Sequence, residues 1–102
     1  MEILVRNLGI KDIRIKVQID FTDDGEEIKY YNINNRKWCE NISQIQNSQS
    51  FQDEQDQKNF EFVIKEIKEA LDDPEVIEWV YDFFEVQHLS SFKVNDLKIY
   101  LC

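Results

Sequence analysis

The clearest pattern in the sequence is a strict alternation of apolar and polar residues between positions 13 and 21. Successive side chains of a β-strand point to opposite faces, so this period of two predicts a strand with one buried face. The apolar positions are Ile13, Ile15, Val17, Ile19 and Phe21. In the following segment Gly25 can adopt a positive φ at little cost, which predicts a hairpin into a further strand over residues 28–33.

Shorter patterns of the same kind occur at both ends of the chain. Residues 2–6 predict a first strand that ends at a turn over residues 7–9. The segment Lys37-Trp38-Cys39 predicts a short fourth strand. Residues 97–101 predict a final strand, preceded by residues 92–94 and a turn at Asn95-Asp96.

Two helices are predicted between these strands. The first ends at about Leu71, and its apolar residues recur at helical spacing and define one buried stripe. These residues are Phe60, Val63, Ile64, Ile67 and Leu71. Asp72-Asp73-Pro74-Glu75 then ends one helix and starts another, because proline suits the first helical position and Asp73 can cap it. The second helix is predicted over residues 74–88, mostly apolar with one acidic ridge.

The order of these elements predicts an α+β fold. We expect a mainly antiparallel sheet of 3–5 strands with two consecutive helices packed on one face, in the order β-β-β-(β)-α-α-β. The 102 residues suit a single domain spanning residues 1–102. Residues 43–54 are rich in Gln, Ser and Asn, and we expect a mobile connection there, with Ser50 or Asp53 capping the first helix.

Charge is distributed unevenly along the chain. Residues 53–85 contain 12 acidic and 3 basic side chains, so this third of the chain accounts for the formal net charge of −9. The remaining residues contain 9 acidic and 9 basic side chains. Nucleic acids and anionic lipid headgroups both require positive charge on the protein. The net charge therefore argues against direct binding to nucleic acid or to membranes.

The compartment can be predicted from what the sequence lacks. The N-terminus has no basic region followed by a long apolar stretch, so it does not resemble a signal peptide. No segment approaches the roughly 20 apolar residues that cross a bilayer. Cys39 and Cys102 have no framework spacing, which favours reduced thiols. We therefore expect a cytoplasmic protein.

Motifs that would carry chemistry are weak. His88 is the only histidine, and nothing in the sequence places Cys39 or Cys102 beside it as a nucleophile or as a metal ligand. Residues 20–25 have the first half of a calcium loop, but Tyr31 stands where a bidentate glutamate is needed. We therefore predict no enzyme, no metal and no cofactor, and an enzyme or ligand binder that uses His88 or Cys39 remains an alternative.

Concentrated negative charge favours binding to a basic protein, because it steers the approach of an oppositely charged surface. We predict an inhibitor or immunity-type protein that occupies the basic surface of a nuclease or another nucleic-acid-binding protein. Carboxylates on the second helix lie about 4.5–6 Å apart along its axis, too sparse for more than partial mimicry of nucleic acid. The predicted partner-binding residues are Glu66, Glu69, Asp72, Asp73, Glu75, Glu78, Asp82, Glu85 and Phe62.

A second interpretation uses apolar surface instead. Phe62 falls on the polar side of the first helix, near Glu66 and Glu69, and Trp38 lies in a turn-rich stretch. Exposed aromatic residues ringed by polar groups are typical of interfaces. The chain would then be an accessory or self-associating α+β domain, for example a homodimer, and its acidity would serve solubility alone.

Overall fold

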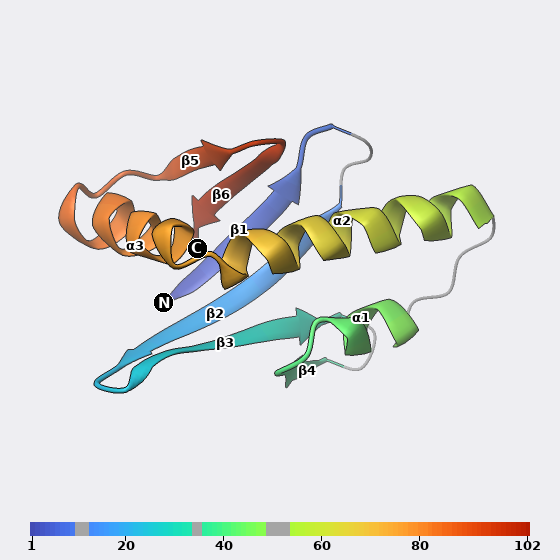
Figure 1. Ribbon diagram of the computed structural model, residues 1–102, viewed down its shortest axis with the longest axis horizontal. Coiled ribbons are helices and arrows are strands. Elements are labelled where there is room, and N and C mark those ends of the chain that lie inside the picture. Colours follow the sequence, from blue (N-terminus) through green and yellow to red (C-terminus); the bar gives the residue numbers. More distant parts are fainter. Residues whose placement is uncertain (10–12, 34–35, 49–53) are drawn as a thin grey trace.

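The computed structural model describes residues 1–9, 13–33, 36–48 and 54–102, and Figure 1 shows how its elements are arranged. In chain order the elements are β1 (Glu2–Asn7), β2 (Arg14–Thr22), β3 (Gly25–Asn32), β4 (Lys37–Cys39), α1 (Ser43–Ser48), α2 (Glu54–Asp72), α3 (Pro74–Tyr81), the π-helical turn η1 (Asp82–Val86), β5 (Ser91–Val94) and β6 (Leu97–Leu101).

All described strands belong to one antiparallel sheet, in the order β4-β3-β2-β1-β6-β5. The predicted α+β class and antiparallel sheet are confirmed. The predicted count of 3–5 strands is wrong, since this sheet has six strands. Residues 91–94 pair with β6 across the Asn95-Asp96 turn, so the chain ends in a hairpin rather than in a single strand. Asn95 has a φ of 54°, a conformation that asparagine tolerates in turns.

The core lies between one face of this sheet and the helices. Alternate residues of the central strands are buried there, among them Ile3 and Val5 of β1, Val17 and Ile19 of β2 and Ile99 of β6. Figure 1 shows α2 crossing β1 and β2 on this side, and its predicted stripe from Phe60 to Leu71 is buried against the sheet. None of the described helices is long and apolar enough to cross a membrane.

Part of the predicted mobile connection over residues 43–54 is a helix, because α1 occupies Ser43–Ser48. The Asn41 side chain accepts hydrogen bonds from the backbone N–H and the hydroxyl of Ser43, which satisfies a free donor at the start of this helix. Ile42 and Ile45 are buried and anchor the segment in the core. Two apolar residues in a polar segment are too few for the periodicity to predict a helix. Ser50 and Asp53 lie outside the described residues.

The predicted second helix over residues 74–88 is a helix from Pro74 to Val86, but only its first part, Pro74–Tyr81, is α-helical. Asp73 caps α3 by accepting a hydrogen bond from the Glu75 N–H at 3.0 Å, as the sequence predicts. The α-helix ends at Tyr81 and continues as η1, whose wider turn is closed by the Gln87 N–H donating to the Asp82 carbonyl at 2.9 Å.

The π-helical turn has a packing consequence. The rings of Phe83 and Phe84 both lie against Phe92 of β5, with centroids 5.0 Å and 5.3 Å away. Consecutive side chains of a regular helix point about 100° apart, and in this widened turn two consecutive rings contact the same strand. His88 follows with a φ of 56°, and the Leu89 N–H donates to the Phe83 carbonyl, which closes the helix end.

We predict that Asp73→Ala lowers the free energy of unfolding by about 1 kcal/mol, because the first turn of α3 loses its side-chain acceptor. Urea denaturation measures the change. Asp73→Asn keeps an acceptor oxygen and should lie within a few tenths of a kcal/mol of the parent protein. Equal losses for both variants would show that the charge of Asp73, and not its cap, stabilises the helix.

Candidate acidic binding surface

The first component of the candidate site is a contact between α3 and the β2–β3 hairpin. Ile77 and Tyr81 lie four residues apart, so they occupy the same side of α3. Phe21 stands near the end of β2, on the face that the helices cover. The rings of Phe21 and Tyr81 meet edge to face, with centroids 5.4 Å apart and planes at 73°.

A cleft of about 340 Å³ opens beside these rings. Its lining residues are Phe21, Glu26, Pro74, Ile77, Glu78 and Tyr81. Phe21 is 41% exposed and Tyr81 is 49% exposed, so a partner can reach both rings. The cleft therefore combines an apolar and aromatic floor with two carboxylates, one from the sheet and one from α3.

Further acidic residues lie close in the chain to those that line this cleft. Asp23 and Asp24 form the exposed turn of the β2–β3 hairpin, separated from Glu26 by Gly25, and Glu75 is exposed at the start of α3. Within the described residues, neither Glu26 nor Glu78 takes part in an ion pair. Carboxylates without a paired cation leave a negative potential that a basic partner can neutralise.

Sequence reasoning missed the contribution of the hairpin. The run of acids around Gly25 is plain in the sequence, but it lies in the part of the chain whose charges sum to zero. Only the packing of α3 against β2 joins these acids to those of the helices. The acidic residues of the hairpin are visible as a local run in the sequence, but they disappear when charge is summed over all residues outside 53–85.

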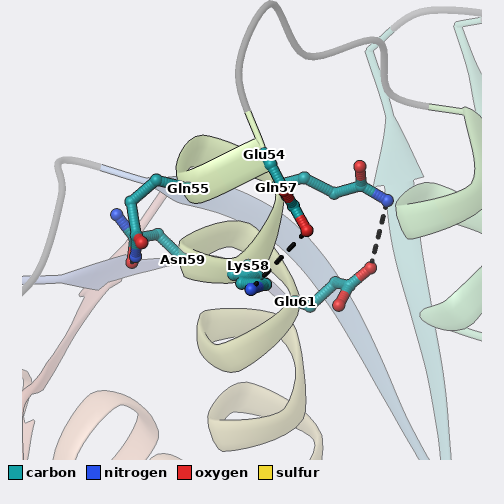
Figure 2. A network of polar contacts seen from close by, with 6 residues as sticks. All are labelled: Glu54, Gln55, Gln57, Lys58, Asn59 and Glu61. Carbon is teal, nitrogen blue, oxygen red and sulfur yellow. Dashed lines mark hydrogen bonds and ion pairs between the residues drawn. The ribbon is translucent and has the colours of Figure 1, made fainter.

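Charge on the first half of α2 is partly compensated, as Figure 2 shows. Lys58 pairs with Glu54 at 3.6 Å, one helical turn away. The Gln57 side-chain amide donates to Glu61 at 3.3 Å, and that of Gln55 donates to Asn59 at 3.1 Å. Glu61 therefore has a neutral hydrogen-bond donor one turn before it. These residues form a solvated helix face.

Phe62, Glu66 and Glu69 form a separate group on the second half of α2. Phe62 is 56% exposed. The group lines a hollow of about 360 Å³ together with Lys65 of α2 and with Asn95 and Asp96 of the β5–β6 turn. Burial raises the pKa of Glu66, and the negative charges of Asp96 and Glu69 raise it further. The charges of Asp96 and Glu69 are therefore close enough to oppose the ionisation of Glu66.

The other predicted site residues have different surroundings. Asp72 lies on another side of α2, in a shallow pocket with Lys68 and Tyr30. The pKa of Tyr30 is raised to about 12, mainly by burial and to a smaller extent by the negative charge of Asp72. The Asp73 side chain is engaged in its helix cap. Asp82 accepts a hydrogen bond from the Gln87 side chain at 2.8 Å.

The nine predicted residues therefore do not form one surface. The structure groups Phe62, Glu66 and Glu69 beside the β5–β6 turn, and it separates Asp72 from them. Glu78 joins the hairpin at the cleft, with Glu75 near it on the same short helix, and Glu85 is exposed on η1. Of these groups, the cleft combines unpaired carboxylates with two accessible aromatic rings.

The residues considered for catalysis have ordinary structural surroundings. The Cys39 thiol donates to the Tyr30 carbonyl at 3.2 Å, and burial raises its pKa, which lowers its thiolate content. His88 is exposed beyond η1, and Trp38 contacts Tyr31 edge to face. Among the described residues, no group of three or more His, Cys, Asp or Glu side chains is arranged to hold a metal ion.

The cleft suits a cationic side chain chemically. A guanidinium or ammonium group is attracted to the face of an aromatic ring, and this attraction grows as water is excluded. Glu26 and Glu78 would accept its hydrogen bonds, and charge-assisted hydrogen bonds are stronger than neutral ones. The geometry therefore favours the side chain of an arginine or a lysine over an acidic or a purely apolar group.

We predict that Glu66→Gln raises the melting temperature at pH 7. The pKa of Glu66 is raised in the folded state, so its ionised form opposes folding once the pH exceeds the ordinary value of about 4.3. The gain should shrink as the pH falls to about 4, where the unfolded state is protonated too. Thermal melts at both pH values test this. Glu85→Gln, which removes the same charge elsewhere, should not reproduce the effect.

No protein-family model, no curated protein sequence and no solved structure matches this chain. The function is therefore inferred from the surfaces of the molecule.

Proposed function

We propose that this protein is an acidic binding module that occupies a basic surface of another protein. The partner's class follows from charge, since nucleases and other nucleic-acid-binding proteins carry such surfaces in order to hold phosphates. The protein would act as an inhibitor or immunity-type protein by covering that surface. The observation that carries the proposal is the cleft between α3 and the β2–β3 hairpin, with its exposed rings and unpaired carboxylates.

The cleft would supply the affinity. Binding energy at interfaces is concentrated in a few aromatic and arginine residues that fill pockets and are shielded from water. Tyr81 and Phe21 are half exposed in the free protein, so a side chain inserted between them and Glu78 would bury new apolar surface. The ring contact already holds the two aromatics in place, which lowers the entropy cost of binding.

The surrounding acids would supply speed and selectivity. Asp23, Asp24 and Glu75 are exposed and lie beside the cleft in the chain. The negative potential of these carboxylates raises the rate of association with a basic protein by about one to three orders of magnitude at low salt, and it repels acidic proteins. The Phe62 group would extend the contact along α2, because it also combines an exposed ring with carboxylates.

Phe62 also supports the second interpretation. An aromatic side chain that is 56% exposed is a candidate for self-association through apolar surface, for example in a homodimer. Such a dimer would persist at high salt, since burial of apolar surface does not depend on screening. Sedimentation at low and high salt distinguishes it from an electrostatic complex.

We predict that Tyr81→Ala weakens binding to the basic partner at least tenfold, or about 1.4 kcal/mol, by removing one wall of the cleft. Glu78→Lys should weaken it further by reversing a carboxylate in the lining. The partner is first captured from lysate at low salt, and affinities are then measured by calorimetry with the purified pair.

Glu85→Lys is the matched control, since it makes the same charge change on η1, outside the cleft lining. It should change the affinity less than Glu78→Lys. Equal losses for Glu78→Lys and Glu85→Lys, together with an unchanged affinity for Tyr81→Ala, would show that net charge alone drives binding and would refute the role of the cleft.

A further inference from the structure

The sheet face opposite the helices carries an ordered array of basic residues. In the strand register Arg6 of β1 faces Arg14 of β2 on one side and Lys98 of β6 on the other. Lys98 in turn faces Lys93 of β5. Because residues that face one another across a ladder point to the same side of a sheet, four cations form one row across four adjacent strands.

The row brings four side chains of one sign together, and Arg6 and Arg14 also interact with other groups of the chain. Like charges directly opposite each other destabilise a sheet, and here the same sign is repeated over three consecutive strand pairs. Neighbouring strands lie about 4.8 Å apart, so the row extends over roughly 14 Å. The core does not require these four cations, because the buried residues that alternate with them along each strand point to the other face of the sheet. A linear array of anions would match the linear arrangement of these cations.

A second row runs parallel to the first. Two residues further along the strands, Tyr100 faces Leu4, and Leu4 faces Lys16. The next strands place Tyr31 opposite Trp38 on the same face, with ring centroids 5.1 Å apart. Two residues of a strand span about 7 Å, so a cationic row and a row rich in aromatic residues lie side by side.

A recess lies between these rows. The pairing of β2 with β3 runs from the hairpin to Val17↔Tyr30, and the two strands diverge beyond that point in Figure 1. A cavity of about 420 Å³ occupies the divergence. Arg14, Lys16 and Tyr31 line it together with Leu4 and Ile33, and the buried residues Ile15, Ile45 and Phe60 complete its apolar lining. The open face therefore offers a hollow in which basic and aromatic side chains meet.

We propose that this open sheet face binds single-stranded nucleic acid, with phosphates along the row Arg6, Arg14, Lys93 and Lys98 and with bases on the aromatic row. Two parallel rows match the repeating unit of such a strand, in which each phosphate is followed by a flat, stackable base. Aromatic stacking of unpaired bases beside a cationic track is the usual way in which proteins hold single strands.

The net charge of −9 does not prevent this binding. The acids of α2 and α3 lie in the helix layer, and packed layers are roughly 10 Å apart. At physiological salt the Debye length is about 8 Å, so a ligand on the open face is influenced chiefly by the charges nearest to it. The expectation of no direct nucleic-acid binding came from the charge of the whole chain, whereas the register gives the local charge. The open face also carries Glu2, which pairs with Lys16 at 3.7 Å, and the acidic pair Asp20 and Glu27, but these residues lie outside the row of four cations.

An acidic protein and a second copy of this chain are the other candidates for this face. Either would neutralise the cations, but neither requires a row of aromatic residues parallel to them. The Lys98 ammonium lies 5.2 Å from the centroid of the Tyr100 ring, so the two rows are in contact where a nucleotide would bridge them. The arrangement favours the single strand.

Fluorescence anisotropy with a labelled 12-nucleotide oligothymidine and with the oligouridine of the same length tests the proposal. The double variant Lys93→Glu/Lys98→Glu should weaken binding at least about tenfold, because two phosphate contacts are replaced by repulsion. Tyr100→Ala should weaken it at least about fivefold through lost stacking. An increase in salt from 50 to 200 mM should lower the affinity of the parent protein for the oligonucleotide by at most about 50-fold, which is the loss expected for four phosphate contacts.

The matched control is Lys65→Glu/Lys68→Glu, which makes the same change in net charge on α2. This variant should retain binding within about threefold, because its charges are screened from the open face. Circular dichroism confirms that each variant is folded. Titration with a duplex of the same length tests whether the face prefers single strands. Sedimentation of the protein alone tests whether the chain self-associates.

The proposal is overturned by an absence of binding at 50 mM salt, by equal losses in the control and row variants, or by duplex binding as tightly as the single strand. Salt-sensitive self-association that Lys93→Glu/Lys98→Glu abolishes would assign the face to a second copy instead. These variants leave the α3–hairpin cleft intact, so failure here is distinguishable from failure of the proposed protein-binding function.

Discussion

The burial of alternate residues of β1, β2 and β6 beneath α2 is the interaction on which the rest of the structure depends. Ile3, Val17 and Ile99 are fully buried on one face, so a shift of any central strand by one residue would place a core residue in water. The register is therefore determined by the hydrophobic side of the sheet. The same register decides which polar residues become neighbours on the open side.

The arrangement of charge is a consequence of that constraint. Once Val5 must face Ile15 and Ile99, Arg6 is required to lie between Arg14 and Lys98. Likewise, α3 packs against the end of the β2–β3 hairpin through the contact of Tyr81 with Phe21, which places Glu78 and Glu26 in the lining of one cleft. The protein thus has a basic row on one side of its sheet and an acidic cleft between the helix layer and the hairpin, and the two proposed activities use these separate surfaces.

Local features of the fold could be predicted from the sequence. Three of these features depend on residues close together in the chain. They are the alternation of apolar and polar residues between Ile13 and Phe21, the helical stripe from Phe60 to Leu71, and the Asp73-Pro74 cap. Helix α1 could not be predicted, since only Ile42 and Ile45 anchor it. The widened turn of η1 depends on contacts with Phe92 of β5.

The candidate sites were less predictable, because they depend on contacts between distant segments. The pairing of β1 with β6 joins the two ends of the chain, and no local pattern indicates it. The row of cations therefore has no signature in sequence order. The acidity of α2 and α3 was visible, but its division among separate groups and its continuation into the hairpin required the packing of α3 against Phe21.

The central claim is that one small fold presents two binding surfaces of opposite charge. Backbone amide chemical shifts, recorded while an arginine-containing peptide and then a short single-stranded oligonucleotide are added, test it most directly. The account predicts that the peptide shifts residues around Phe21, Glu26 and Tyr81, and that the oligonucleotide shifts Arg6, Lys98 and Tyr100 without displacing the peptide. Both ligands shifting the same residues, or neither producing localised shifts, would contradict it.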